Sequence, residues 1–264
     1  MLEAGVAWLK TASWLEMTVA LTAENFLLLL LAITLGEWAA RRYATARVAP
    51  PAPPLSRFEV GLAVFNTFLN TATTLLGLAL WRAGIIRFRT DTGLFAWLDV
   101  FALVAIMDLA MYLLHRLAHH PWLFPWLHRL HHEYDRPRPL TLFVLHPFEN
   151  ISFGLLWLTV ISLYPASWLG MSVYLALNLF FGTVGHLGVE PLPAGWPKWP
   201  GLKWLAGSTF HAWHHQRPET NFGFYTLTWD RLFGTLEANY WRWFGRLPPV
   251  EVPATPNTVK PTAP

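Results

Sequence analysis

The sequence contains no cysteine among its 264 residues. This absence excludes disulfide bonds, thiolate metal sites and iron–sulfur clusters. Any metal that the chain binds must therefore be held by nitrogen and oxygen ligands.

Charged residues are also scarce, at 13% of the chain, whereas hydrophobic residues make up 54% and tryptophan occurs 16 times. These proportions are unusual for a water-soluble domain and indicate a protein embedded in lipid. The net charge of +3 could suggest a nucleic-acid partner. However, the basic residues lie beside apolar segments and form no compact cluster, so membrane topology explains them better and no nucleic acid is expected.

Several apolar segments approach the roughly 17–25 residues that a helix needs to cross a bilayer. Three of them span about 24–40, 60–81 and 94–114, and a fourth covers 151–185 with an interruption at Pro165. Because proline breaks a continuous helix, the fourth segment is expected to form a helical hairpin. Composition and pattern thus predict an all-α integral membrane protein with about four transmembrane helices, three plus the hairpin.

The chain divides into three predicted regions. Residues 1–93 would form an interfacial helix over 1–23, retained in the mature protein, and the first transmembrane helices; residues 94–247 would form the catalytic domain. The proline-rich residues 248–264 are expected to be a flexible tail. If the helices alternate in direction, one side of the membrane carries more arginine than the other, and this side is expected to be cytoplasmic. The histidines would then face the cytoplasm.

All 11 histidines lie between His115 and His215, which indicates a shared role. Three motifs contain eight of them, at offsets of three and four residues that place side chains on one face of a helix. The motifs are HRLAH with His115 and His119, HRLHH with His128, His131 and His132, and HAWHH with His211, His214 and His215. A lone histidine near a membrane surface is usually an interfacial side chain, but three such clusters can enclose two metal ions. We therefore expect a cytosolic helical cap that holds a histidine-rich site for two metals.

Ligand type alone leaves the metal open, because imidazole suits zinc, copper, iron and nickel. A zinc peptidase is disfavoured because HRLAH lacks the glutamate of the HExxH motif. A carboxylate-bridged di-iron bundle is disfavoured because the sequence contains no Glu-x-x-His pair. A histidine-dominated cluster at a membrane surface remains.

Residues around the motifs are candidates for supporting roles. His186 follows the hairpin and is expected to be a further ligand; His146 is a possible ligand, and His120 is not expected to bind metal. Asp108 and Tyr112 share a helical stripe with His115 and could hydrogen-bond a ligand ring. Most acidic residues near the motifs are expected to pair with neighbouring arginines instead. These acids are Glu133, Asp135, Glu149, Glu219 and Asp230.

The three motifs in this order, together with DLAMYLLHR, LHPFE and WDRLFGT, resemble the fatty acid hydroxylase/sterol desaturase superfamily of membrane histidine-box oxygenases. The resemblance covers about residues 95–236, and the combined motifs are highly specific. It implies two non-haem iron ions, held by the eight motif histidines, that activate O2 and abstract hydrogen from an unactivated C–H bond. His186 is similar to the family's histidine before the third motif, and Asn221 with Gly223 to the Asn-Phe-Gly that follows it. Asn221 is therefore expected, like Asp108 and Tyr112, to support the ligands.

The resemblance implies an enzyme that hydroxylates or desaturates a lipid such as a sterol, fatty acyl or sphingoid lipid. Its electrons are expected from a separate donor such as a ferredoxin or a cytochrome, because the sequence contains no GxGxxG fingerprint, cysteine cluster or recognisable haem module. The alternative is a non-catalytic membrane protein that binds metal or acts as a scaffold.

Overall fold

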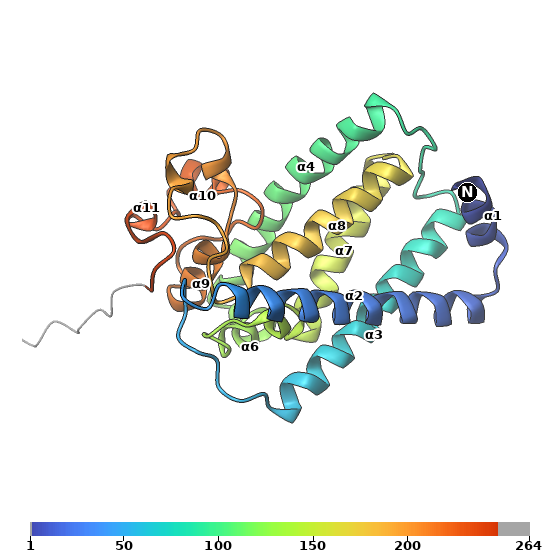
Figure 1. Cartoon of the computed structure of the whole chain (residues 1–264). Coiled ribbons are helices and arrows are strands. Elements are labelled where there is room, and N and C mark those ends of the chain that lie inside the picture. Colours follow the sequence, from blue (N-terminus) through green and yellow to red (C-terminus); the bar gives the residue numbers. More distant parts are fainter. Residues whose placement is uncertain (1, 248–264) are drawn as a thin grey trace, which may run out of the picture.

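A computed structural model describes residues 2–247 of the chain, and within them every regular element is a helix (Figure 1). Three isolated β-bridges occur there, but no strand. The helices are α1 (Leu2–Thr11), α2 (Trp14–Arg42), α3 (Arg57–Arg82), α4 (Leu94–Ala118), α5 (Phe124–Leu127), α6 (Arg129–His132), η1 (Pro139–Phe143), α7 (Pro147–Leu163), α8 (Trp168–Gly185), η2 (Trp196–Lys198), η3 (Leu202–Trp204), α9 (Ser208–Gln216), α10 (Thr228–Leu232) and α11 (Tyr240–Trp243).

Four helices, α2, α3, α4 and α8, are long and apolar enough to cross a membrane. The all-α prediction is confirmed within the described residues, which contain four candidate membrane helices, and the predicted hairpin is formed by α7 and α8 around Pro165. The 17-residue helix α7 is apolar but shorter than the other four. Many leucine and aromatic side chains on these helices point outward, as expected for surfaces that contact lipid rather than water.

Capping residues decide where the first two long helices begin. Ser13 accepts a hydrogen bond from the backbone of Glu16, whose carboxylate accepts one from the Ser13 backbone. This reciprocal pair starts α2 at Trp14, so the expectation of one helix over 1–23 is wrong: α1 ends at Thr11, and its interfacial position stays a prediction. Ser56 and Glu59 form the same arrangement at the start of α3.

A buried carboxylate ties the hairpin turn to α4. Asp99 accepts hydrogen bonds from the Tyr164 hydroxyl, the Ser167 amide and the Arg89 guanidinium. A methyl group at Gly170 would lie 2.5 Å from Cβ of Asp99, so the absence of a side chain at this position lets α8 approach α4 closely. These contacts set the relative position of the two helices that carry His115 and His186.

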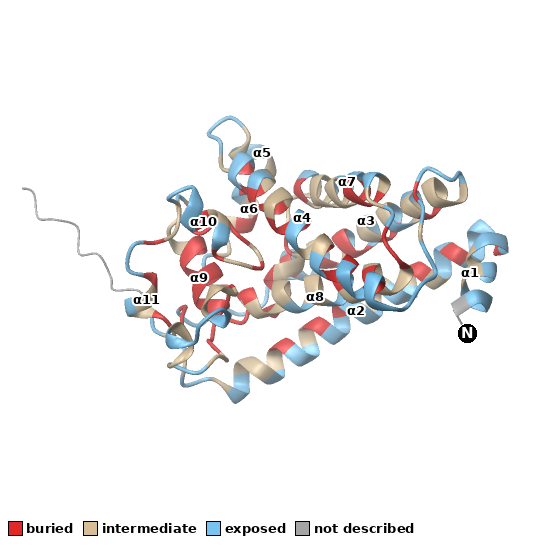
Figure 2. Cartoon of the chain, turned by 90° about the horizontal axis from the view of Figure 1, so that it is seen from above, coloured by how far each residue is buried: buried red, intermediate tan, exposed pale blue. Residues whose placement is uncertain are grey.

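The long helices meet the cap, residues 186–247, at one end of the bundle (Figure 1). The amide of Val48, just after α2, donates to the carbonyl of Gly188, just after α8, and Asn66 of α3 donates to two carbonyls in the segment before α7. Within the cap, α9 is buried along nearly its whole length (Figure 2). The division into regions at residue 93 stays a prediction, and the expected tail over 248–264 lies outside the described residues.

Candidate metal centre

Nine histidines from four short stretches of chain converge where α4 and α8 end against the cap. His115 lies in the last turn of α4 and His119 directly follows it, whereas His186 directly follows α8. His128, His131 and His132 lie at or within α6, and His211, His214 and His215 lie on α9. The structure thus brings together all nine histidines that the sequence analysis selected as principal ligands.

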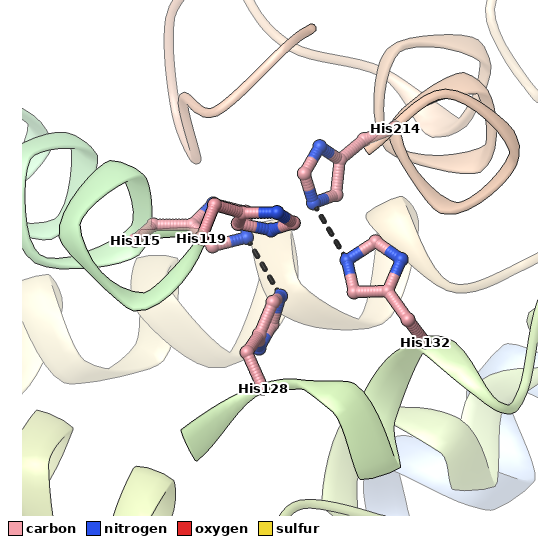
Figure 3. A group of neighbouring side chains, drawn as sticks. All are labelled: His115, His119, His128, His132 and His214. Atoms are coloured by element: carbon pink, nitrogen blue, oxygen red, sulfur yellow. Dashed lines mark hydrogen bonds between the residues drawn. The ribbon is translucent and has the colours of Figure 1, made fainter. Parts of the chain in front are cut away.

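The nine rings form two groups, each with its ligand nitrogens within 4.8 Å of one another. The five-histidine group, shown in Figure 3, contains His115, His119, His128, His132 and His214. The four-histidine group contains His131, His186, His211 and His215. Two groups of this size match the expectation of a site for two metal ions.

Two histidines outside the three motifs, the possible ligand His146 and the expected non-ligand His120, lie away from both groups. His146 caps the start of α7, where its Nδ1 accepts a hydrogen bond from the Phe148 amide, and it belongs to neither group. His120 is exposed and also lies outside both groups. Helix α4 ends at Ala118, so His120 lies beyond it, and its Nδ1 accepts a hydrogen bond from the Trp122 amide at 3.4 Å.

Backbone carbonyls orient four of the rings. Nδ1 of His115 lies 2.8 Å from the carbonyl oxygen of Phe222, and Nδ1 of His214 lies 2.7 Å from that of Thr220. His131 and His186 make equivalent contacts, at 3.1 and 2.8 Å, with the carbonyls of Val144 and Gly182. A carbonyl can only accept a hydrogen bond, so each of these rings donates through Nδ1 and keeps a lone pair on Nε2.

The Nε2 lone pairs then point at one another. Nε2 of His131 and Nε2 of His186 are 3.3 Å apart, and both rings are held by carbonyls at Nδ1. Two lone pairs at this distance repel, whereas a cation shared between them converts the same geometry into coordination. The residues therefore fit bound metal ions better than they fit a network of hydrogen bonds.

Several further ring nitrogens have no hydrogen-bond partner although they are buried. They are Nε2 of His119, Nδ1 of His132 and Nδ1 of His215. A buried nitrogen without a partner costs about 1–3 kcal/mol. A metal ion in the five-histidine group would satisfy Nε2 of His119 without any rearrangement of the chain, whereas His132 and His215 face their groups through Nε2 rather than Nδ1.

Burial keeps the imidazoles neutral, which is the protonation state that binds metal. Loss of hydration lowers the pKa of His131 to about 4 and that of His186 to about 3. The pKa of His119 and that of His132 fall to about 2, because burial is reinforced by neighbouring imidazoles. Near neutral pH, these rings offer lone pairs rather than positive charge.

A carboxylate orients a fifth ring. Oε1 of Glu149, in the first turn of α7, lies 2.5 Å from Nδ1 of His128, and both side chains are only 3% exposed. Nε2 of His128 then faces the five-histidine group, 2.9 Å from Nε2 of His115. The expectation that Glu149 pairs with an arginine is therefore wrong, because its position on α7 points it into the site.

The segment after α9 is fixed by the buried carboxylate of Asp230. Asp230 accepts hydrogen bonds from the amides of Phe222 and Gly223, each at 2.7 Å, and this places the Phe222 carbonyl against His115. Asp230 thus binds backbone amides, contrary to the expected arginine pairing. A side chain at Gly223 would lie 2.6 Å from the carbonyl of Thr226, so the turn requires glycine.

The three residues expected to support the ligands bind other groups. Asp108 accepts from the Tyr225 and Thr226 amides, and the Tyr112 hydroxyl bonds the Thr235 hydroxyl. Asn221 has a positive φ of 59° and bonds the backbone of Phe210 and Glu237. None of these hydrogen bonds reaches a ligand ring, so all three act on the loops around the site rather than on a histidine directly.

Sequence reasoning missed most of the groups that orient the rings. Four are backbone carbonyls, which carry no signal in a sequence. Glu149 did carry one, because an acid within an apolar helix needs a buried partner. The expected pairings of Glu133 with Arg129 and of Asp135 with Arg136 do occur, at 3.9 and 3.8 Å on the exposed surface, whereas Glu219 has no ion pair within the described residues.

Comparison with known proteins adds a separate line of support. Residues 100–235 match the model of a family described as fatty acid hydroxylase, and this interval contains both histidine groups. No solved structure shows a significant match.

Three curated relatives illustrate the range of similar proteins. A Delta(7)-sterol 5(6)-desaturase of Leptosphaeria maculans is 26% identical over 153 residues, which cover 55% of this chain and 40% of the relative. A very-long-chain aldehyde decarbonylase of Oryza sativa subsp. indica is 32% identical, over 52% of this chain and 23% of the relative. A putative methylsterol monooxygenase of Dictyostelium discoideum is 30% identical, over 52% of this chain and 50% of the relative. The chain thus spans half or less of the length of these relatives.

Proposed function

Because this chain belongs to the fatty acid hydroxylase family, we propose that it is a membrane-bound oxygenase that acts on lipids. In this proposal, two non-haem iron ions lie in the two histidine groups. O2 and externally supplied electrons are used to hydroxylate, or alternatively to desaturate, an unactivated C–H bond. The substrate would be an apolar lipid such as a sterol, a fatty acyl lipid or a sphingoid lipid.

The observation that carries the proposal is the convergence of Nε2 lone pairs within two buried groups of imidazoles. Carbonyl oxygens fix Nδ1 as the donor in His131 and His186, and their Nε2 atoms face each other at 3.3 Å. The same arrangement recurs in the five-histidine group, where carbonyls hold His115 and His214. Nine neutral imidazoles in two groups favour a pair of divalent ions.

The ligand set determines which metals fit. Imidazole nitrogens bind iron well but do not exclude zinc or copper, so the choice of iron rests on the family. Bound iron would supply the one-electron chemistry needed to activate O2. The histidines would hold the two ions in place, and Glu149 and the four carbonyls would hold the histidines.

The surroundings of the site suit an apolar substrate and exclude water. Phe222 packs against His115 and His119 with ring centroids 5.8 and 5.1 Å away, and Phe224 lies 5.2 Å from His115. These aromatic side chains therefore line the five-histidine group with apolar surface. Exclusion of water limits side reactions of reduced oxygen species.

Topology and partners follow from the position of the site. The site lies at one end of the bundle; α2 closes with Arg41 and Arg42, and α3, the next helix of the chain, opens with Arg57. We assign this arginine-rich end to the cytoplasmic side, where a separate ferredoxin or cytochrome would deliver electrons.

The test is lipid mass spectrometry on the native host grown under ¹⁸O2. Cells with the wild-type chain are compared with cells carrying His214→Ala at equal membrane levels, and His146→Ala serves as a matched control outside both groups. A lipid that carries ¹⁸O with the wild type and His146→Ala, but not with His214→Ala, supports hydroxylation and identifies the substrate. A lipid lighter by two hydrogens without label supports desaturation.

Other outcomes favour different functions. A hydrocarbon one carbon shorter than a lipid aldehyde would place the activity with the relatives named as aldehyde decarbonylases. Identical lipid profiles for all three chains, with iron bound and a reductant present, would contradict the enzyme hypothesis. The chain would then be better described as a metal-binding or scaffold protein of the membrane.

A further inference from the structure

The segment between the first two histidine motifs is uncharged and highly exposed. Residues 121–127 read PWLFPWL, and they include the short helix α5. The side chain of Trp122 is 83% exposed and that of Trp126 is 67% exposed. Two large tryptophans exposed within five residues are costly in water, so this surface needs an apolar covering.

The position of this segment indicates what covers it. It starts three residues after the end of α4, whose Leu113 and Leu117 are both exposed, one helical turn apart, on a helix long enough to span a membrane. In Figure 2, α5 and its flanking loop stand out from the side of the molecule where the long helices reach the cap. The exposed apolar surface of the spanning helix therefore continues onto Trp122 and Trp126.

The residues on either side of the segment suit the boundary between lipid and water. Arg116 and Arg129 are exposed on either side of it. Arginine suits this boundary because its stem packs on apolar surface while its charged head stays in the polar layer. Tryptophan itself is enriched at membrane interfaces, where its ring is partly apolar and its N–H meets water. This composition fits a bilayer better than a protein partner.

The inner side of the same segment touches the metal centre. The ring of Phe124 lies 5.2 Å from that of His119 and 5.7 Å from that of His132, measured between centroids. The segment 121–127 thus exposes Trp122 and Trp126 on its outer side and contacts the candidate ligands His119 and His132 through Phe124 on its inner side. Because the segment is short, any lipid chain beside Trp122 or Trp126 is already close to the site.

We propose that residues 121–127 are immersed in the interfacial layer of the bilayer and form the side from which an apolar lipid chain reaches the metal centre. The immersion rests on exposure and position alone, whereas the entry route rests on the proposed function. In this proposal the lipid bilayer covers the surface formed by Trp122 and Trp126.

The absence of native cysteine allows a direct test of immersion, because a single introduced cysteine can be spin-labelled without background. Trp122→Cys and Trp126→Cys are compared with Leu31→Cys, exposed on α2, and Ala238→Cys, exposed before α11. The labelled full-length proteins are placed in vesicles of phosphatidylcholine and phosphatidylglycerol. Collision of the nitroxide with O2, which partitions into lipid, is measured against collision with a water-soluble nickel chelate.

We expect the labels at 122 and 126 to favour O2 over the nickel chelate, as the label at 31 does. Labels at both positions that match the label at 238 would overturn the proposal, whether or not the protein is an oxygenase. If these labels lie in lipid while no lipid product forms, the proposed function fails and the immersion stands.

The entry route is tested with the double variant Trp122→Ser/Trp126→Ser in the ¹⁸O2 experiment. Its matched control is Trp38→Ser/Trp97→Ser, which removes two exposed tryptophans from α2 and α4. We expect the first variant alone to lose product several-fold while its metal content equals that of the wild type. Equal product from the two variants would overturn the entry route.

Discussion

Replacing Glu149 should weaken metal binding without unfolding the protein. The carboxylate lies 2.5 Å from Nδ1 of His128, and both groups are buried, so no water can take over as acceptor. In Glu149→Leu, the His128 N–H loses its partner, and its imidazole can rotate or change tautomer away from the geometry that presents Nε2 to the metal.

The size of the effect follows from this contact. Loss of a carboxylate behind a metal-bound histidine typically lowers metal affinity about 10–100-fold, or about 1.4–2.7 kcal/mol. Glu149→Gln keeps an oxygen that can accept the N–H but loses the charge, so its loss should be smaller. The order of affinity is expected to be wild type, then glutamine, then leucine.

The assay is titration of the purified, metal-free protein in detergent with Fe²⁺ under anaerobic conditions against a competing chelator. Glu133→Gln is the matched control, because this neighbouring carboxylate is 58% exposed and 3.9 Å from Arg129. Thermal unfolding of each metal-free variant shows whether it is folded. A folded Glu149→Leu variant with the same affinity as Glu133→Gln would refute the assigned role of Glu149.

Three further predictions concern the site and the loop that supports it. His131→Ala should lower bound metal as measured by elemental analysis, whereas His146→Ala should not, because only His131 belongs to a histidine group. In metal-free protein, burial lowers the pKa of His131 to about 4, so the unfolded chain takes up its proton first as the pH falls. The free energy of unfolding should therefore fall by roughly 3 kcal/mol for this residue as the pH drops from about 6.5 to 4, and the unfolding temperature should fall with it. An unfolding temperature that stays constant over this range would contradict the prediction. Gly223→Ala places a methyl 2.6 Å from the Thr226 carbonyl and 2.8 Å from the Asp230 carboxylate, and should cost about 1–3 kcal/mol, seen as a lower unfolding temperature.

Local patterns in the sequence predicted much of the fold. Apolar length identified the long helices, because a bilayer requires a minimum span. The apolar pattern predicts that the first long helix starts at about residue 24, ten residues after the observed start of α2 at Trp14, because polar residues in its first turns obscure the pattern. The Ser-x-x-Glu signal of Ser13 and Glu16 would have located this boundary.

The composition and the three histidine motifs by themselves predicted an apolar, helical chain with a candidate metal site made of histidine nitrogens. Only the tertiary structure decided how the nine histidines divide. The neighbours His131 and His132 enter different groups, as do His214 and His215, because adjacent residues on a helix point about 100° apart. Which group each ring joins, and which carbonyl or carboxylate holds its Nδ1, depends on how α4, α7, α8 and α9 pack, and this packing brings together residues that are distant in the sequence.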